Sequence, residues 1–237
     1  MSRELKVYQK QAQSSLNNID AYGDILNLSS SKDEYKHFND RTEADKWGIS
    51  IYSDWSRRYK SIIKTAKELS PKIKSIPQSA LEGYCGYSVR EINTYMRGWD
   101  SVDEQYKEAA DILAFTIASA PRIPENIVVY RGVCDEFIQE LIRENKRGIP
   151  VVEKGFLSTS LLNNISKADG QFAASQYLLK IYVPKGTFGI YVNAVTRRDE
   201  YEMLIAPNSY LRLVEYPYED SNLNKWIFEC SLLSLTL

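Results

Sequence analysis

Glu200 and Glu202 are the side chains of this sequence whose spacing best suits acid–base chemistry. Two residues apart on a β-strand, they would share one face, with about 6–7 Å between their Cα atoms. Glu202 precedes the apolar run Met203–Ile205, whereas Glu200 follows a charged segment. Carboxylates in different surroundings can divide the roles of acid and base. An acidic pair of this kind more often lies in a solvated loop. A catalytic role for the pair is therefore indicated only if suitable partner residues occur elsewhere in the chain.

Arg131 and Ser158 are the partners that such a pair would need. Arg131 closes the β-branched run Ile127–Tyr130, and a guanidinium there can donate two hydrogen bonds to a phosphate. Gly132 lets a ligand approach the backbone. Strand alternation places Ser158 on a face that could be buried, where its hydroxyl needs a partner such as a carboxylate. Taken alone, such an arginine more often forms only an ion pair at a strand end.

The elements that must position these residues change type halfway along the chain. Helical spacing marks the first half and short β-branched runs mark the second, which predicts an α+β fold rather than a wound parallel sheet. We expect one domain over residues 1–237, mainly helical in 1–120 and mainly β in 121–237. The expected helices are 4–18, 33–45, 44–66, 88–98, 101–119 and 134–147, and the expected strands are 127–132, 155–160, 178–183, 188–192, 200–205, 209–216 and 225–235.

Composition excludes several classes of function. The 237 residues are 43% hydrophobic and carry a net charge of −1, whereas a nucleic-acid surface normally shows a basic excess. Three scattered cysteines and a single histidine, His37, predict no metal site, no disulfide framework and no Ser-His-Asp triad. The N-terminal residues do not have the pattern of a signal peptide, and no apolar run reaches the roughly 18–20 residues of a membrane span.

In combination, these motifs resemble those of the bacterial mono-ADP-ribosyltransferase toxins of the arginine–serine–glutamate class. The likeness is greatest to the catalytic domains of binary toxins that modify actin and to the small Rho-modifying exoenzymes. It covers most of the chain after residue 40. The segments that carry it are Glu43–Gly48, Arg90–Asn93 with Arg97, Ile123–Gly132, Gly155–Ser160, Phe172, Val183–Gly186 and Glu200–Glu202.

The resemblance implies a fold and a substrate. The fold would be an N-terminal helical segment packed on a mixed β-sandwich core of two short-stranded sheets, with a cleft for NAD. NAD would be a substrate, and no metal would be needed. Arg131 would hold its phosphates and Gly132 would lie beside the nicotinamide amide. Ser158 would orient Glu202, which would bind a hydroxyl of the nicotinamide ribose and stabilise the charge that develops as the glycosidic bond breaks.

Four further residues receive roles from the same resemblance. Phe172 would lie against the nicotinamide ring, and Asn93 and Arg97, at i and i+4 of one helix, would contact the nucleotide end of NAD. Glu200 would take a proton from an acceptor arginine, since a protonated guanidinium is a poor nucleophile. The predicted catalytic residues are therefore Arg131, Ser158, Glu200 and Glu202, and core packing is the alternative for Phe172.

The implied biology is a secreted toxin that acts on a protein in the host cytosol. Actin and small GTPases are candidate targets, and a separate translocation component is a further candidate partner. Two departures from the family pattern matter. Ser175 stands where relatives often have an arginine, and the loop Val195–Asp199 lacks the aromatic that touches the protein substrate. An NAD glycohydrolase and a non-catalytic binding module on the same fold remain the alternatives.

Overall fold

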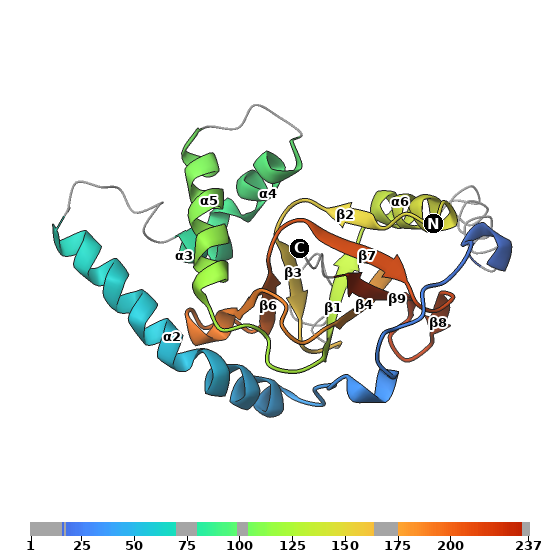
Figure 1. The fold of residues 1–237 in the computed structure, drawn as a ribbon, viewed down its shortest axis with the longest axis horizontal. Helices are drawn as coiled ribbons and strands as arrows, with labels where there is room; N and C mark the ends of the chain where they lie inside the picture. Colours follow the sequence, from blue (N-terminus) through green and yellow to red (C-terminus); the bar gives the residue numbers. More distant parts are fainter. Residues whose placement is uncertain (1–15, 17, 70–79, 99–103, 164–174, 234–237) are drawn as a thin grey trace.

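The first half of the chain is helical, as its apolar spacing predicted. The computed structural model describes residues 16, 18–69, 80–98, 104–163 and 175–233 (Figure 1). The expected helices 44–66, 88–98 and 101–119 are confirmed within these residues, whereas 4–18 lies almost wholly outside them. The helices are α2 (Arg41–Leu69), α3 (Ala80–Gly83), α4 (Val89–Arg97) and α5 (Glu104–Ser119), with a π-helical turn, η4 (Tyr84–Ser88), between α3 and α4.

The expected helix over residues 33–45 is wrong for its first part. Only a 3-10 turn, η2 (Lys32–Glu34), forms there, and helical structure resumes at Arg41. Between them, Lys36 pairs with Ile127 at the start of β1 (Ile127–Val133) and exchanges backbone hydrogen bonds with the residues on either side of it. These bonds to a distant strand satisfy the backbone of this segment, so tertiary structure overrides its local helix preference.

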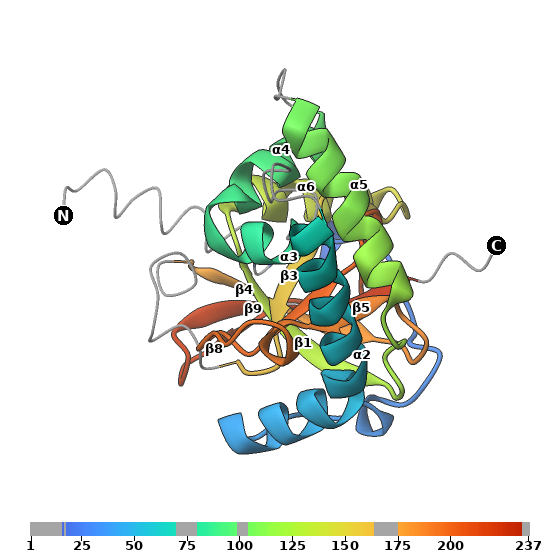
Figure 2. The ribbon, with the colours of Figure 1, turned by 90° about the vertical axis from the view of Figure 1, so that its left-hand side faces the viewer.

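Helix α2 packs directly against the edge of the sheet because Gly48 has no side chain. A Cβ atom on Gly48 would come 2.0 Å from the ring of Tyr191, which ends strand β5 (Gly189–Tyr191). The Tyr191 hydroxyl donates to Asp45 at 2.5 Å. In the view of Figure 2, α2 and α5 lie in front of the sheet, and Trp55 of α2 donates to Ser119 of α5. The helical half is thereby fixed to the β half.

In the second half, the described residues form nine strands, one α-helix and a short 3-10 helix (Val192–Ala194). Two three-residue strands, β2 and β8, were missed, since alternation cannot be read over so few positions. The remaining strands and the helix are confirmed with shifted ends. In chain order, the predicted and the missed elements together are β1, α6 (Asp135–Lys146), β2 (Val151–Glu153), β3 (Leu157–Ser160), β4 (Tyr177–Val183), β5, β6 (Glu202–Ile205), β7 (Ser209–Leu213), β8 (Tyr218–Asp220) and β9 (Lys225–Leu233).

Hydrogen bonds connect all these strands in the order β2-β7-β9-β4-β1-β3-β6-β5, with β8 beside β9. The two sheets that we expected are joined, because Tyr130 of β1 pairs with Ser160 of β3. The sheet is mixed: β4 and β9 run parallel and the other pairs are antiparallel. The α+β class is confirmed, and strands β3 and β6, which carry Ser158 and Glu202, are neighbours.

The main hydrophobic core contains residues from both halves of the chain. Leu113 and Ile117 of α5 are fully buried in it together with Val129 of β1 and Leu204 of β6. Helices α2 and α5 contact the β5 end of the sheet, whereas α6 contacts β2 and β7 at the other end (Figure 1). A shared core is what a single domain requires, and the single-domain organisation remains our prediction.

A second, smaller core covers the outer face of β1, β4 and β9. Its centre is Glu229, a buried carboxylate that accepts hydrogen bonds from Lys32, Lys180, Tyr182 and Tyr218. Burial alone would raise the pKa of Glu229, but the two lysines and Tyr182 outweigh it and lower the pKa to about 2. Lys32 thus ties the segment before α2 to the sheet.

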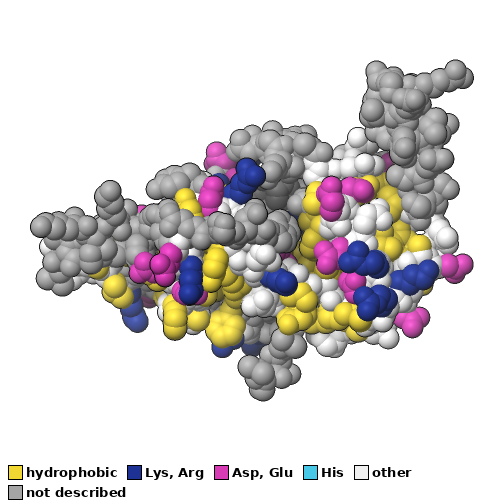
Figure 3. All heavy atoms as spheres, turned by 90° about the horizontal axis from the view of Figure 1, so that it is seen from above, with side chains coloured by type: hydrophobic (Ala, Val, Ile, Leu, Met, Phe, Trp, Pro, Cys, Tyr) yellow, Lys and Arg dark blue, Asp and Glu magenta, His cyan; other side chains and the backbone are white. Residues whose placement is uncertain are grey.

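The surface carries charges of both signs. On the face drawn in Figure 3, Lys and Arg side chains alternate with Asp and Glu among hydrophobic ones. None of the helices in the described part of the chain is both long and apolar enough to cross a bilayer. That the protein binds no nucleic acid remains a prediction.

Candidate active site

Glu202 and Ser158 meet across two neighbouring strands. β6 begins at Glu202, and its antiparallel register with β3 places Ser160 opposite Glu202. Ser158 is two residues along on the same face, which makes it the diagonal neighbour of Glu202. Its hydroxyl donates a hydrogen bond to Glu202 Oε1. The structure therefore brings together the serine and the glutamate that the sequence analysis paired.

One oxygen of the Glu202 carboxylate has no hydrogen-bond partner among the described residues. The residue is 3% exposed, and Oε2 accepts no hydrogen bond from the described residues. Burial raises the pKa of this carboxyl above its ordinary value, although the Ser158 hydroxyl and the positive charge of Arg198 act in the opposite direction. A buried acceptor of this kind is costly unless a ligand group supplies the missing hydrogen bond.

Glu200 does not share a strand face with Glu202, and that expectation was wrong. The strand starts only at Glu202, because Tyr201 between the two glutamates has a positive φ of 49°. This left-handed conformation costs a residue other than glycine about 1–2 kcal/mol. The burial of the Tyr201 side chain and a hydrogen bond from Leu161 N–H to its carbonyl hold it there. Glu200 consequently lies in a turn at the edge of the site.

Arg198 is what connects the two carboxylates. Its Nη2 is 2.9 Å from Glu200 Oε1, and its Nη1 is 3.7 Å from Glu202 Oε2. Cys85, in the π-helical turn η4, interacts electrostatically with the same guanidinium. Burial alone would lower the pKa of Arg198, but Glu200 and Glu202 outweigh it and raise the pKa. We did not predict Arg198 or Cys85 as part of the site.

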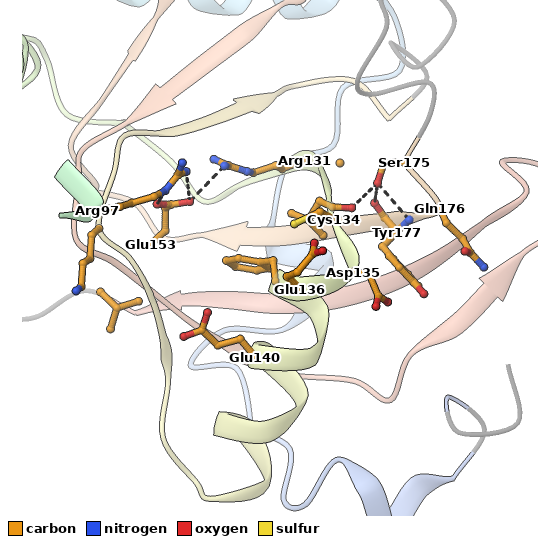
Figure 4. Close-up of a pocket in the computed structure, with 15 residues that line it drawn as sticks. Arg97, Arg131, Cys134, Asp135, Glu136, Glu140, Glu153, Ser175, Gln176 and Tyr177 are labelled. Carbon is orange, nitrogen blue, oxygen red and sulfur yellow. Dashed lines mark hydrogen bonds and ion pairs between the residues drawn. The ribbon is translucent and has the colours of Figure 1, made fainter. Parts of the chain in front are cut away.

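A second cluster lies at the other end of the site, where Glu153 holds two arginines (Figure 4). Arg97 donates to both carboxylate oxygens at 3.0 and 2.9 Å, and Arg131 donates to Oε2 at 3.2 Å. Burial alone would raise the pKa of Glu153, but these two guanidinium groups lower it below its ordinary value. Two cations around one carboxylate leave this cluster with a formal charge of +1.

Arg131 also links this cluster to the glutamate site, because its Nη1 is 3.4 Å from the Ser158 carbonyl. Asn93, one turn before Arg97 on α4, has a different environment. It is buried, accepts from Phe156 N–H at 2.9 Å and donates to the Tyr84 hydroxyl at 3.0 Å. Asn93 thus anchors the start of β3, and its expected contact with a nucleotide remains a prediction.

A cavity of about 800 Å³ opens beside the arginine cluster. Arg97, Arg131 and Glu153 form one wall, and Asp135, Glu136 and Glu140 of α6 form the opposite wall (Figure 4). Gly132 lines it, as expected for a glycine beside a ligand. Ser175 also lines it, and its hydroxyl oxygen lies 2.6 Å from the carbonyl oxygen of Val133 and 2.7 Å from that of Tyr177. Phe172 lies outside the described residues.

The arrangement can bind an anion and stabilise a nearby cation. The arginines would attract phosphate, and the buried Glu202 carboxylate would stabilise positive charge. No group of three His, Cys, Asp or Glu in the described part of the chain could hold a metal ion. Glu153 was missed because strand β2, on whose buried face it lies together with Val151, was not predicted.

Comparison with known families gives a clear match. The sequence profile of the ADP-ribosyltransferase exoenzyme family matches residues 44–233, which include every element of the site. Among curated proteins, none matches the sequence significantly.

Solved structures share the fold. BECa, an ADP-ribosylating toxin of a binary enterotoxin of C. perfringens solved with NADH, has 24% identity and a TM-score of 0.62. The match covers 84% of this chain and 50% of BECa, so the chain spans half the length of that toxin. The C3 exoenzyme of Clostridium limosum has 19% identity and a TM-score of 0.60, over 84% of this chain and 98% of the exoenzyme. C3stau2 of S. aureus, solved with NAD, has 20% identity and a TM-score of 0.61, over 85% and 99% of the two chains.

Proposed function

Because the chain belongs to the ADP-ribosyltransferase exoenzyme family, we propose that it transfers ADP-ribose from NAD to an arginine of a target protein. The observation that carries this proposal is the buried Glu202 carboxylate, which accepts the Ser158 hydrogen bond on one oxygen and no hydrogen bond from the described residues on the other. A hydroxyl of the nicotinamide ribose would supply the missing donor.

The proposed chemistry uses the buried charge of Glu202. When the bond between ribose and nicotinamide breaks, positive charge develops on the ribose, and nicotinamide leaves as a neutral group. A carboxylate fixed beside that charge stabilises the transition state, as in glycoside hydrolysis. Ser158 contributes by fixing the carboxylate in one orientation, because its hydroxyl occupies Oε1 and leaves Oε2 for the substrate.

The arginine cluster would bind the two phosphates of NAD. Arg97 and Arg131 lie 19–21% exposed at the wall of the cavity, and both donate to the same carboxylate of Glu153. An arginine can donate up to five hydrogen bonds, and Arg131 uses two of its N–H groups in the contacts with Ser158 and Glu153. In this role Glu153 is a positioning residue: it fixes the two guanidinium groups relative to each other before the phosphates arrive.

Glu200 supports the choice of arginine as acceptor. Its carboxylate is 36% exposed at the rim of the site, and it already accepts a hydrogen bond from a guanidinium, that of Arg198. A carboxylate in this place can orient an incoming guanidinium and take its proton. The target is a host protein, with actin and small GTPases as candidates, and secretion and action in the host cytosol follow from the same proposal.

The test separates transfer from the breakdown of NAD. Glu200→Gln should lower transfer to agmatine, a small guanidine acceptor, by about 100-fold or more, because a general base contributes about 10²–10⁴-fold. The release of nicotinamide in water should fall much less, since Glu202 is unchanged; this residual reaction is the glycohydrolase activity. Glu219→Gln, in an exposed carboxylate of β8, is the matched control and should change neither.

Three results would contradict parts of the proposal. Equal loss of both reactions in Glu200→Gln would refute the division of roles between the two glutamates. Modification of asparagine instead of arginine, identified by mass spectrometry, would refute the acceptor. If the wild-type chain released no nicotinamide at all, the chain would be a binding module on the transferase fold.

A further inference from the structure

Arg198 is partly buried and lies between the two glutamates of the site, unlike an arginine in an ordinary surface ion pair. Its Nη2 is 2.9 Å from Glu200 Oε1, and its side chain is 30% exposed. The same guanidinium faces Glu202, with Nη1 3.7 Å from Oε2. This distance is too long for a hydrogen bond, so Oε2 remains unsatisfied although a donor lies next to it. The two groups are close, and each still has hydrogen-bonding capacity to offer.

Arg198 occupies the position that an acceptor arginine must take in the proposed reaction. One nitrogen must contact the carboxylate that takes its proton, and Nη2 contacts Glu200. Another part of the guanidinium must lie beside the carboxylate that holds the ribose, and Nη1 lies beside Glu202. Holding a nucleophile close to the reacting carbon can replace a bimolecular encounter and gives large rate advantages. Arg198 is in this position within its own chain.

We propose that Arg198 is itself an acceptor, so that the protein ADP-ribosylates its own loop within one molecule. The proposal rests on the arginine transfer proposed above. In the step, the bond between ribose C1′ and the nicotinamide nitrogen breaks, and its electron pair leaves with nicotinamide. A nitrogen of Arg198 forms the new bond to C1′, and its proton passes to Glu200 and then to water. No oxidant, reductant or further reactant is required.

ADP-ribose attached to Arg198 would block further transfer by the same molecule. The product places two phosphates on a side chain that lies between Glu200 and Glu202, where the next acceptor has to enter. Each chain would therefore accept one ADP-ribose at this residue. Since donor site and acceptor belong to one molecule, the rate constant would not depend on protein concentration.

The experiment incubates the full chain with labelled NAD, digests it and maps the label by mass spectrometry. Agmatine transfer is measured in parallel on the same preparation. We expect label on Arg198, at no more than one per chain, with a first-order rate constant that is the same in dilute and concentrated protein. Arg198→Lys should lose this label, because lysine has no guanidinium. Arg197→Lys is the matched control, since Arg197 is exposed and makes no ion pair with the described residues, and it should keep the label.

The outcomes separate the two proposals. If agmatine is modified but Arg198 of the wild-type chain carries no label, the self-modification is refuted and the arginine transferase stands. If agmatine and every arginine of the chain stay unmodified, the transferase proposal itself fails. Labelling whose rate rises with protein concentration would also refute transfer within one molecule. Thermal melting shows whether both variants are folded. If one of them is not, the peptide map of the wild-type chain still decides the question.

Discussion

Replacing Glu202 with glutamine should lower activity and raise stability at the same time. Glutamine has the same shape and can still accept the Ser158 hydrogen bond on its carbonyl oxygen, but it carries no charge. Loss of a fixed electrostatic stabiliser typically costs about 10²–10³-fold in rate, and we expect nicotinamide release to fall by that amount. Glu219→Gln is again the control and should leave the rate unchanged.

The gain in stability follows from the burial of the carboxylate. The group is 3% exposed, and its Oε2 has no hydrogen-bond partner among the described residues. A buried polar atom in this state costs about 1–3 kcal/mol. The positive charge of Arg198 offsets part of this cost. The offset is small because Arg198 Nη1 is 3.7 Å from Glu202 Oε2 and the same guanidinium also pairs with Glu200. We expect the free energy of unfolding of Glu202→Gln at pH 7 to exceed that of the wild type by about 1 kcal/mol.

The gain in stability should depend on pH. Because burial raises the pKa of Glu202 in the folded state, the native wild-type protein takes up a proton here before the unfolded chain does as pH falls. Acidification therefore stabilises the wild type relative to the glutamine variant. The difference should be fully present above the folded pKa and should disappear as pH falls to the ordinary value of 4.5.

Urea denaturation between pH 4 and pH 8 measures this difference, and chromatography of released nicotinamide measures the rate. A variant that is less stable than the wild type at pH 7, or a gain that does not change with pH, would show that burial of this charge is not costly. A variant that keeps most of its nicotinamide release would show that the charge is not needed for catalysis.

Three other substitutions test the surrounding contacts. Ser158→Ala removes a donor that lowers the pKa of Glu202, so the acid limb of nicotinamide release should move to higher pH in a pH–rate profile. Glu153→Gln should raise KM for NAD about tenfold and change kcat less. The two arginines lose the charged carboxylate that holds both of them, a loss worth roughly one charge-assisted hydrogen bond. Steady-state kinetics measures KM and kcat separately. Glu229→Gln should lower the free energy of unfolding by about 3 kcal/mol in urea denaturation, because two lysines lose their buried partner, and nicotinamide release well below the melting temperature should not change.

The secondary structure was predictable where the apolar period ran for several turns or alternations. Helices α2 and α5 and strands β1, β4 and β9 have such runs, and all were expected from the sequence. The short strands β2 and β8 have none. The segment around Lys36 was assigned the wrong structure, because its backbone partners belong to a strand about 90 residues later.

The candidate site was predictable in part. The resemblance to the toxin family paired Ser158 with Glu202, and the contact is present because β3 and β6 are adjacent antiparallel strands. The spacing of Glu200 and Glu202 misled us, because a strand was assumed through Tyr201, whose positive φ breaks the alternation. Glu153 and Arg198 were not found, because an ion pair between distant segments leaves no periodic pattern in the sequence.

Sequence alone determined the residue types, their order and therefore the family, since Arg131, the serines near Ser158 and the two glutamates occur in the order that this chemistry uses. Tertiary structure decided which charges meet. Folding places Glu153 between two arginines and Arg198 between two glutamates. These contacts arise from strand register and from turns, and the Coulomb energy between the charges depends on distances that only the packed chain fixes.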